Sequence, residues 1–121
     1  SLARIENSDW FSVAMTDGLI FAITKEIKDE LERFDFTKNK LGWGIDCAFC
    51  TLAYTNNRLV VADASVSVIH HQGSGYDQSE ARQGFQRFLA QFTFAEYTQF
   101  ILLKTHVNTR HRLISKNKIS Y

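Results

Sequence analysis

Proline is absent from this 121-residue sequence, so no turn or helix end is fixed by a pyrrolidine ring. Cysteine is scarce, at two residues, which argues against a disulfide-dense secreted scaffold. No apolar run approaches the ~20 residues of a membrane span. A formal net charge of only +1 argues against a general binder of nucleic acid or membrane surfaces. The sequence does have 45% hydrophobic residues, ten of them Phe, and this predicts one domain over residues 1–121.

The two cysteines have CxxC spacing, at Cys47 and Cys50. A redox motif usually carries Gly or Pro between the thiols, and here Ala48 and Phe49 intervene. A structural zinc site needs four ligands, and the chain has no second CxxC. We therefore interpret both as helix-core thiols in a reducing cytoplasm. No basic stretch followed by an apolar region opens the chain, and Ser1 in place of Met is typical of a processed or excised piece.

Hydrophobic periodicity predicts about four short strands and four helices. Apolar, β-rich segments predict the strands at Trp10–Met15, Leu19–Thr24, Arg58–Ala62 and Ser65–His70. Helical spacing predicts the helices at Lys25–Phe34 after a Thr24 N-cap, at about Ile45–Thr55, from Gln78 to Phe92, and from the Thr93–Glu96 capping box to about Arg112. The fold class is α/β or α+β, with a C-terminal helical segment over residues 77–121.

Two motifs carry residues that can do chemistry. Gly42–Asp46 places a carboxylate after a Gly-Trp-Gly turn, at the predicted start of a helix. His70–Tyr76 places imidazoles at the end of a predicted strand that leads into a Gly-Ser-Gly loop. A carboxylate and a histidine held on loops by rigid elements are what an acid–base or metal-assisted site needs.

The stretch Thr16–Glu26, the connector after it and Gly42–Asp46 resemble the C-terminal half of glycosyltransferases with the GT-A fold. Galactosyltransferase-like members carry Gly-Glu-Asp after the Trp-Gly, whereas this chain has only Ile45-Asp46, so one acid is missing. The predicted strand ending at His70 and the loop up to Tyr76 are also similar to that family. The resemblance covers about residues 16–80.

The resemblance implies a partial GT-A-like mixed sheet with flanking helices. This would be the acceptor-side half of an enzyme that transfers a sugar from a nucleotide-sugar donor to an acceptor hydroxyl. The family's nucleotide-binding half and its Asp-x-Asp metal motif have no counterpart in this chain. The 121 residues are therefore expected to be a fragment that needs a missing N-terminal domain or partner chain and is inactive alone.

The resemblance also assigns roles to individual residues. Asp46 would be the general base that takes a proton from the acceptor hydroxyl, held ionised at a helix N-terminus. His70 would ligate the Mn²⁺ or Mg²⁺ that bridges the donor diphosphate, with His71 as the second choice. The residues expected to contact substrate are Trp43, Gly44, Gly18 and Tyr76.

Each of these residues also has a structural interpretation. In this interpretation Asp46 is an acid that only caps its helix. His70 is a histidine at the end of a strand that is hydrogen-bonded to the backbone. Trp43 is as well explained as a core residue under the turn, and the glycines as positions that need unusual backbone angles.

Two other functions stay open from the sequence. The first is a non-catalytic α/β interaction module that packs on a partner through its Phe-rich helices. Its basic stretch from Lys104 onward would then dock on a partner or on phosphate, or simply complement the helix dipole. The second is a small metal-dependent hydrolase using His70, His71 and an acid, which lacks a third histidine at ligand spacing.

Overall fold

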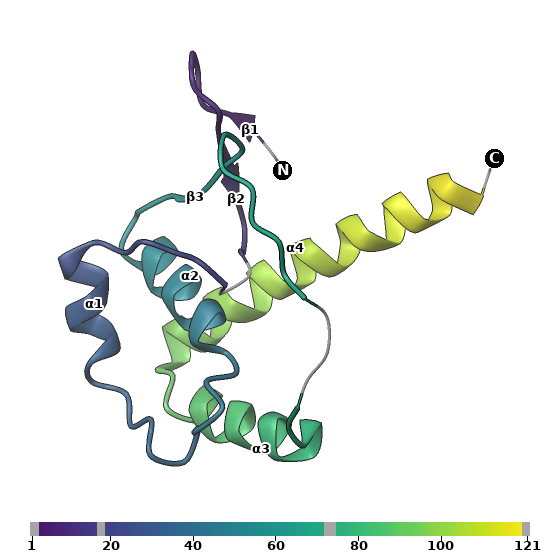
Figure 1. Cartoon of the computed structure of the whole chain (residues 1–121). Coiled ribbons are helices and arrows are strands. Elements are labelled where there is room, and N and C mark those ends of the chain that lie inside the picture. The colour runs from purple at the N-terminus through teal and green to yellow at the C-terminus, as the bar shows by residue number, and fades with distance from the viewer. Residues whose placement is uncertain (1–2, 17–18, 72–74, 120–121) are drawn as a thin grey trace.

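The computed structural model describes residues 3–16, 19–71 and 75–119, and Figure 1 shows the arrangement of its elements. Three strands form one sheet in the order β1-β2-β3, namely β1 (Ala3–Arg4), β2 (Trp10–Val13) and β3 (Val60–Asp63). The helices are α1 (Lys25–Leu31), α2 (Ile45–Thr55), α3 (Gln78–Leu89) and α4 (Phe94–Ile119). The sheet is antiparallel and its strands do not alternate with helices as βαβ units do, so the fold belongs to the α+β class.

The sheet is small and joins segments that are far apart in the sequence. Trp10 of β2 lies opposite Asp63 of β3, and Val13 lies opposite Val60. The pairings β1–β2 and β2–β3 are both antiparallel, so the described strands do not form the mixed sheet that was expected. The hydroxyl of Tyr54 in α2 donates to the carbonyl of Val13, which attaches the sheet to the helical part of the molecule.

Two predicted strands are wrong. Residues 19–24 and 65–70 have no regular secondary structure, although their sequences are β-rich. A strand needs a neighbour for its backbone N–H and C=O groups, and within the described ranges neither segment is paired with one. The other two strands were predicted close to their positions, but β1 is too short to show a period and was missed.

The helices follow the sequence signals closely. The Thr24 hydroxyl accepts a hydrogen bond from the Ile27 amide at the start of α1, as predicted. Helix α2 has the predicted bounds, and α3 begins at Gln78. The capping box before α4 is present in both directions. Thr93 N donates to the Glu96 carboxylate at 3.2 Å, and Glu96 N donates to the Thr93 hydroxyl at 3.3 Å. Helix α4 continues to Ile119, beyond the predicted end.

Helix α2 forms the centre of the core, with α1 on one side and α4 on the other in Figure 1. Its buried side chains meet residues from α1, β3 and α3 in one cluster. The Phe34 ring packs against Phe88 and Phe92, with centroids 5.1 and 5.6 Å apart, and Phe100 of α4 packs against Phe92. Phe88, Phe92 and Phe100 of the Phe-rich C-terminal segment are therefore packed within the chain.

An ion pair fastens the start of α4 to the segment after α1. The guanidinium of Arg33 bonds the carboxylate of Glu96, whose side chain is only 7% exposed. Burial by itself raises the pKa of Glu96, but hydrogen bonds from Arg33 and Thr93 outweigh it and lower that pKa below 4.5. Glu96 thus closes the capping box and pairs with Arg33 at the same time.

Replacing Glu96 by Gln should cost about 1–3 kcal/mol of unfolding free energy at pH 7, because Arg33 loses its buried partner. A lowered pKa stabilises the fold above the unfolded value of 4.5. This contribution disappears as the pH falls through the folded value. Urea titrations at pH 7 and pH 3 should therefore show a difference between parent and variant that shrinks at pH 3. Glu6→Gln, at an exposed position, is the control, and equal losses for both variants would contradict this account.

Candidate functional site

Trp43 and Tyr76 form a hydrogen-bonded aromatic pair, although 33 positions separate them. The indole Nε1 of Trp43 donates to the Tyr76 hydroxyl at 2.9 Å. The two rings meet edge to face, with centroids 6.3 Å apart at an angle of 84°. Tyr76 is 44% exposed and Trp43 is partly exposed, so a ligand can reach the pair. The structure thus brings together two of the residues predicted to contact substrate.

The turn that carries Trp43 depends on Gly44. Gly44 has a φ of +89°, in the left-handed region that side chains disfavour. A Cβ at this position would also lie 2.2 Å from Cδ2 of Phe85, far inside van der Waals contact. Gly44 is therefore required by its backbone angle and by packing against α3. No ligand contact is needed to explain it.

Asp46 lies in the first turn of α2 and is half-buried. Its Oδ1 accepts a hydrogen bond from the Cys47 amide at 2.8 Å, so one carboxylate oxygen is held by the helix end. This hydrogen bond supports the structural interpretation, in which Asp46 caps its helix. Asp46 follows Trp43 by three residues, so Asp46 lies in the first turn of α2 and Trp43 lies in the turn just before that helix. A carboxylate so held can accept a proton from a hydroxyl bound nearby.

Within the part of the chain that the structure describes, His70 and His71 are not grouped with other metal ligands. His70 and His71 are both exposed in the irregular segment that replaces the predicted strand. Over residues 3–16, 19–71 and 75–119, no group of three or more His, Cys, Asp or Glu could hold a metal ion. These residues therefore do not fit a resident Mn²⁺ or Mg²⁺ site. Gly18 lies outside the described residues.

Both cysteines are free thiols inside α2. Burial, together with the neighbouring Asp46 carboxylate, raises the pKa of Cys47 to about 12. Burial likewise raises the pKa of Cys50 to about 11. A thiolate is the nucleophile and metal ligand, so these groups are inert near neutral pH, which agrees with the interpretation as core thiols.

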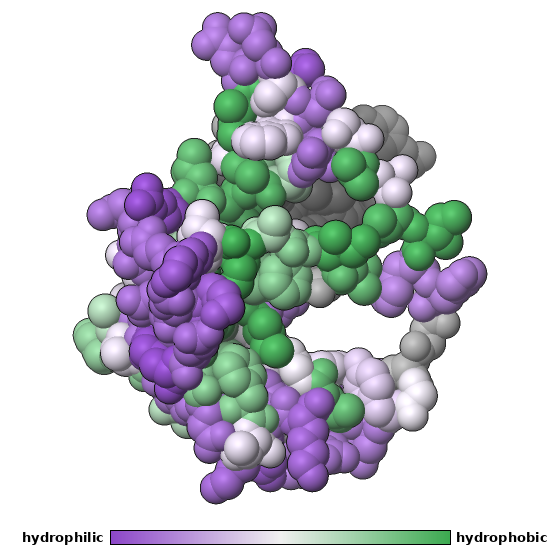
Figure 2. All heavy atoms as spheres, turned by 60° about the vertical axis from the view of Figure 1, so that its left-hand side comes forward, coloured by the Kyte–Doolittle hydropathy of each residue, from purple (hydrophilic) through white to green (hydrophobic). Residues whose placement is uncertain are grey.

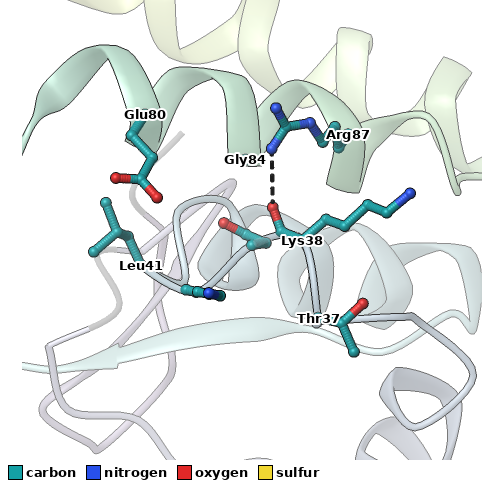
Figure 3. Close-up of a pocket in the computed structure, with 8 residues that line it drawn as sticks. Thr37, Lys38, Leu41, Glu80, Gly84 and Arg87 are labelled. Carbon is teal, nitrogen blue, oxygen red and sulfur yellow. Dashed lines mark hydrogen bonds between the residues drawn. The ribbon is translucent and has the colours of Figure 1, made fainter.

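A cavity of about 260 Å³ lies between the connector before the Gly-Trp-Gly turn and α3 (Figure 3). Three cationic side chains and one carboxylate line it, so its charge is net positive: Lys38, Lys40, Arg87 and Glu80. Arg87 donates to the Lys38 carbonyl at 3.4 Å, which ties the connector to α3. Sequence reasoning missed this cavity because α3 is about forty positions further along the chain.

Large apolar side chains are exposed in three stretches of the chain, at residues 19–21, 59–69 and 94–102. Figure 2 shows hydrophobic residues running in a band across the middle of one face. An extended exposed apolar surface is typical of a region that contacts another protein or domain. None of the described helices is both long and apolar enough to cross a lipid bilayer.

Comparisons of the chain with protein-family models, curated proteins and solved structures gave no match. An inference about function therefore depends on the residues of the Gly-Trp-Gly motif and on the contacts around Trp43.

The thiols of Cys47 and Cys50 should react with iodoacetamide at least about 100-fold more slowly at pH 8 in the folded chain than in guanidinium chloride, because so few are ionised. Their raised pKa stabilises the fold below the unfolded value of 9.0. This stabilisation is lost as the pH rises toward 11–12. Mass spectrometry of timed samples measures the rates. Cys47→Ala and Cys50→Ala assign them to each thiol, and rapid labelling of both in the native chain would contradict the burial argument.

Proposed function

We propose that this chain is the acceptor-side portion of a nucleotide-sugar-dependent glycosyltransferase of the GT-A type. The observation that carries the proposal is the exposed Trp43–Tyr76 pair beside the helix start that bears Asp46. Aromatic rings suit the C–H faces of pyranose sugars, and deprotonation of a sugar hydroxyl requires a carboxylate within reach of the bound sugar. The resemblance of Gly42–Asp46 to the family motif supports the same assignment.

In the proposed reaction the aromatic pair holds an acceptor sugar next to Asp46. The acceptor oxygen forms a bond to the anomeric carbon of the donor while the bond from that carbon to the diphosphate breaks. The diphosphate leaves with the electron pair, and the acceptor proton passes to the Asp46 carboxylate. The effectiveness of Asp46 depends on its distance from the hydroxyl, which its position at the rigid start of α2 fixes.

The donor-binding half of such an enzyme would lie outside these 121 residues. A divalent ion supplies charge neutralisation to the leaving diphosphate in this family. Because the described residues do not fit a complete metal site, no step is assigned to the metal here. His70 remains the residue of this chain proposed to contribute a ligand, with His71 as the second choice, and the remaining ligands would come from outside the chain. The proposed location is the cytoplasm.

Trp43→Ala should weaken binding of methyl pyranosides about tenfold, because a stacking ring is lost. Saturation-transfer NMR with a panel of methyl glycosides measures this directly on the 121-residue chain. Trp10→Ala is the matched control, since Trp10 is 49% exposed and lies on the sheet. Equal sugar signals from the Trp43→Ala variant and the parent would exclude the acceptor site.

Asp46→Asn separates binding from chemistry. It should leave sugar binding within about twofold of the parent, because the rings are unchanged. In an enzyme that also contains the donor-binding half, the same variant should lower transfer by about 10²–10⁴-fold. Asp29→Asn, at an exposed position in α1, is the control for loss of a carboxylate. Transfer retained by Asp46→Asn would remove Asp46 as the base.

A second candidate function is a non-catalytic module that binds a partner through α4. The observation that favours it is the exposure of apolar side chains on the first half of this helix, including Phe94 at 89%. The Phe rings of the core are already packed within the chain, so a partner would contact Phe94, Tyr97, Ile101 and Leu102 instead.

Light scattering after size exclusion tests this second candidate. It predicts association of the parent chain that Leu102→Glu abolishes, because a charge in an apolar contact is costly to desolvate. Thr105→Glu, also exposed on α4, is the control. A parent chain that is monomeric at all concentrations would argue against self-association through this helix.

A further inference from the structure

Asn39 is buried under the Gly-Trp-Gly turn, and the sequence motifs did not single it out. It is 4% exposed, and its Nδ2 donates to the carbonyl of Trp43 at 2.8 Å. This bond fixes the backbone of the residue whose ring meets Tyr76. A buried amide that bonds a turn carbonyl holds the turn in one conformation, because the alternative leaves the buried amide donor unpaired.

Helix α3 approaches Asn39 at Gly84, which is buried in the middle of the helix. A Cβ at Gly84 would lie 2.8 Å from Oδ1 of Asn39 and 3.4 Å from its Cα. Only glycine allows this approach, although glycine is unfavourable inside a helix. The Asn39 Oδ1 is itself buried without a hydrogen-bond partner in the described part of the chain. A glycine inside a helix and an unpaired buried oxygen are both unfavourable. Both are explained by the close approach of α3 to Asn39.

The contacts next to Gly84 hold the same turn. Phe85, the following residue of α3, lies where a side chain on Gly44 would be, so it packs directly on the turn backbone. Tyr76, just before the N-cap of α3, accepts the hydrogen bond from the Trp43 indole. Residues 76–85 therefore contact the turn at three positions, namely Asn39, Trp43 and Gly44.

We propose that Asn39, seated on Gly84, is a positioning residue that sets the orientation of Trp43 toward Tyr76 and thereby the shape of the acceptor site. The proposal rests on the proposed function for its biological meaning, but its geometric content concerns this chain alone. Asn39 acts through the Trp43 carbonyl and is only 4% exposed, so its proposed role requires no contact with the sugar. Its loss should change ligand binding only because Trp43 moves.

The test uses the 121-residue chain with Trp10→Phe, so that Trp43 is the only tryptophan. Asn39→Ala removes the donor to the Trp43 carbonyl, and Gly84→Ala pushes against the Asn39 amide. Both should change acrylamide quenching of Trp43 at least about twofold and shift its emission, because the ring leaves Tyr76. Both should weaken methyl pyranoside binding in the NMR assay. The controls Asn108→Ala and Gln86→Ala, at exposed helical positions, should leave both signals unchanged.

The double variant Asn39→Ala/Gly84→Ala separates positioning from stability. Removing the Asn39 side chain relieves the clash with the new methyl group, so the melting temperature should recover relative to Gly84→Ala alone. The Trp43 signals should stay shifted, because the carbonyl still lacks its donor. A purely structural role predicts that both recover. If Asn39→Ala does not fold, Gly84→Ala alone tests the proposal: unchanged Trp43 signals in folded Gly84→Ala would then overturn the positioning role.

The outcomes distinguish this proposal from the proposed function. Unchanged Trp43 quenching and emission in a folded Asn39→Ala variant would overturn the positioning role, whether or not the parent binds sugar. Shifted Trp43 signals without sugar binding by any variant, including the parent, would support the positioning of Trp43 and reject the glycosyltransferase assignment.

Discussion

The burial of α2 is the constraint on which the rest of the structure depends. Ala48, Cys50 and Thr51 are fully buried, and they belong to different faces of the same helix. Protein interiors are close-packed and tolerate few voids. A helix that is covered on all sides therefore determines the position of every element that packs on it. Thr51 is accommodated because its hydroxyl donates to the Cys47 carbonyl within the helix. The sheet, α1 and α4 are each placed by contact with α2.

The candidate site inherits its rigidity from this helix. The Gly-Trp-Gly turn ends where α2 begins, so Asp46 and Trp43 are attached to the helix at the centre of the core. The opposite wall of the site comes from Tyr76 and α3, which pack through Phe88 on the same core. A site built between two packed elements keeps its geometry without a ligand, which lowers the entropic cost of binding.

The sequence predicted the helices well and the strands poorly, for one physical reason. A helix satisfies its hydrogen bonds locally, so caps such as Thr24 and the box at Thr93 and Glu96 are visible in the sequence. A strand needs a partner from elsewhere, and alternation in residues 65–70 says nothing about whether one exists. The residues of the candidate site also differ in whether a local sequence signal reveals them. Trp43 and Asp46 belong to a local motif, whereas the contact between Asn39 and Gly84 joins positions 45 apart and has no local signal.

The exposed irregular segment at residues 64–71 has a consequence for the connectivity of the chain. It joins the sheet and α2 to the α3–α4 pair, yet its side chains contribute nothing to the core. The two parts are held together instead by noncovalent contacts across the join, such as Phe34 with Phe88 and Arg33 with Glu96. A protease cut, or a domain inserted at this point, would leave these noncovalent contacts unbroken.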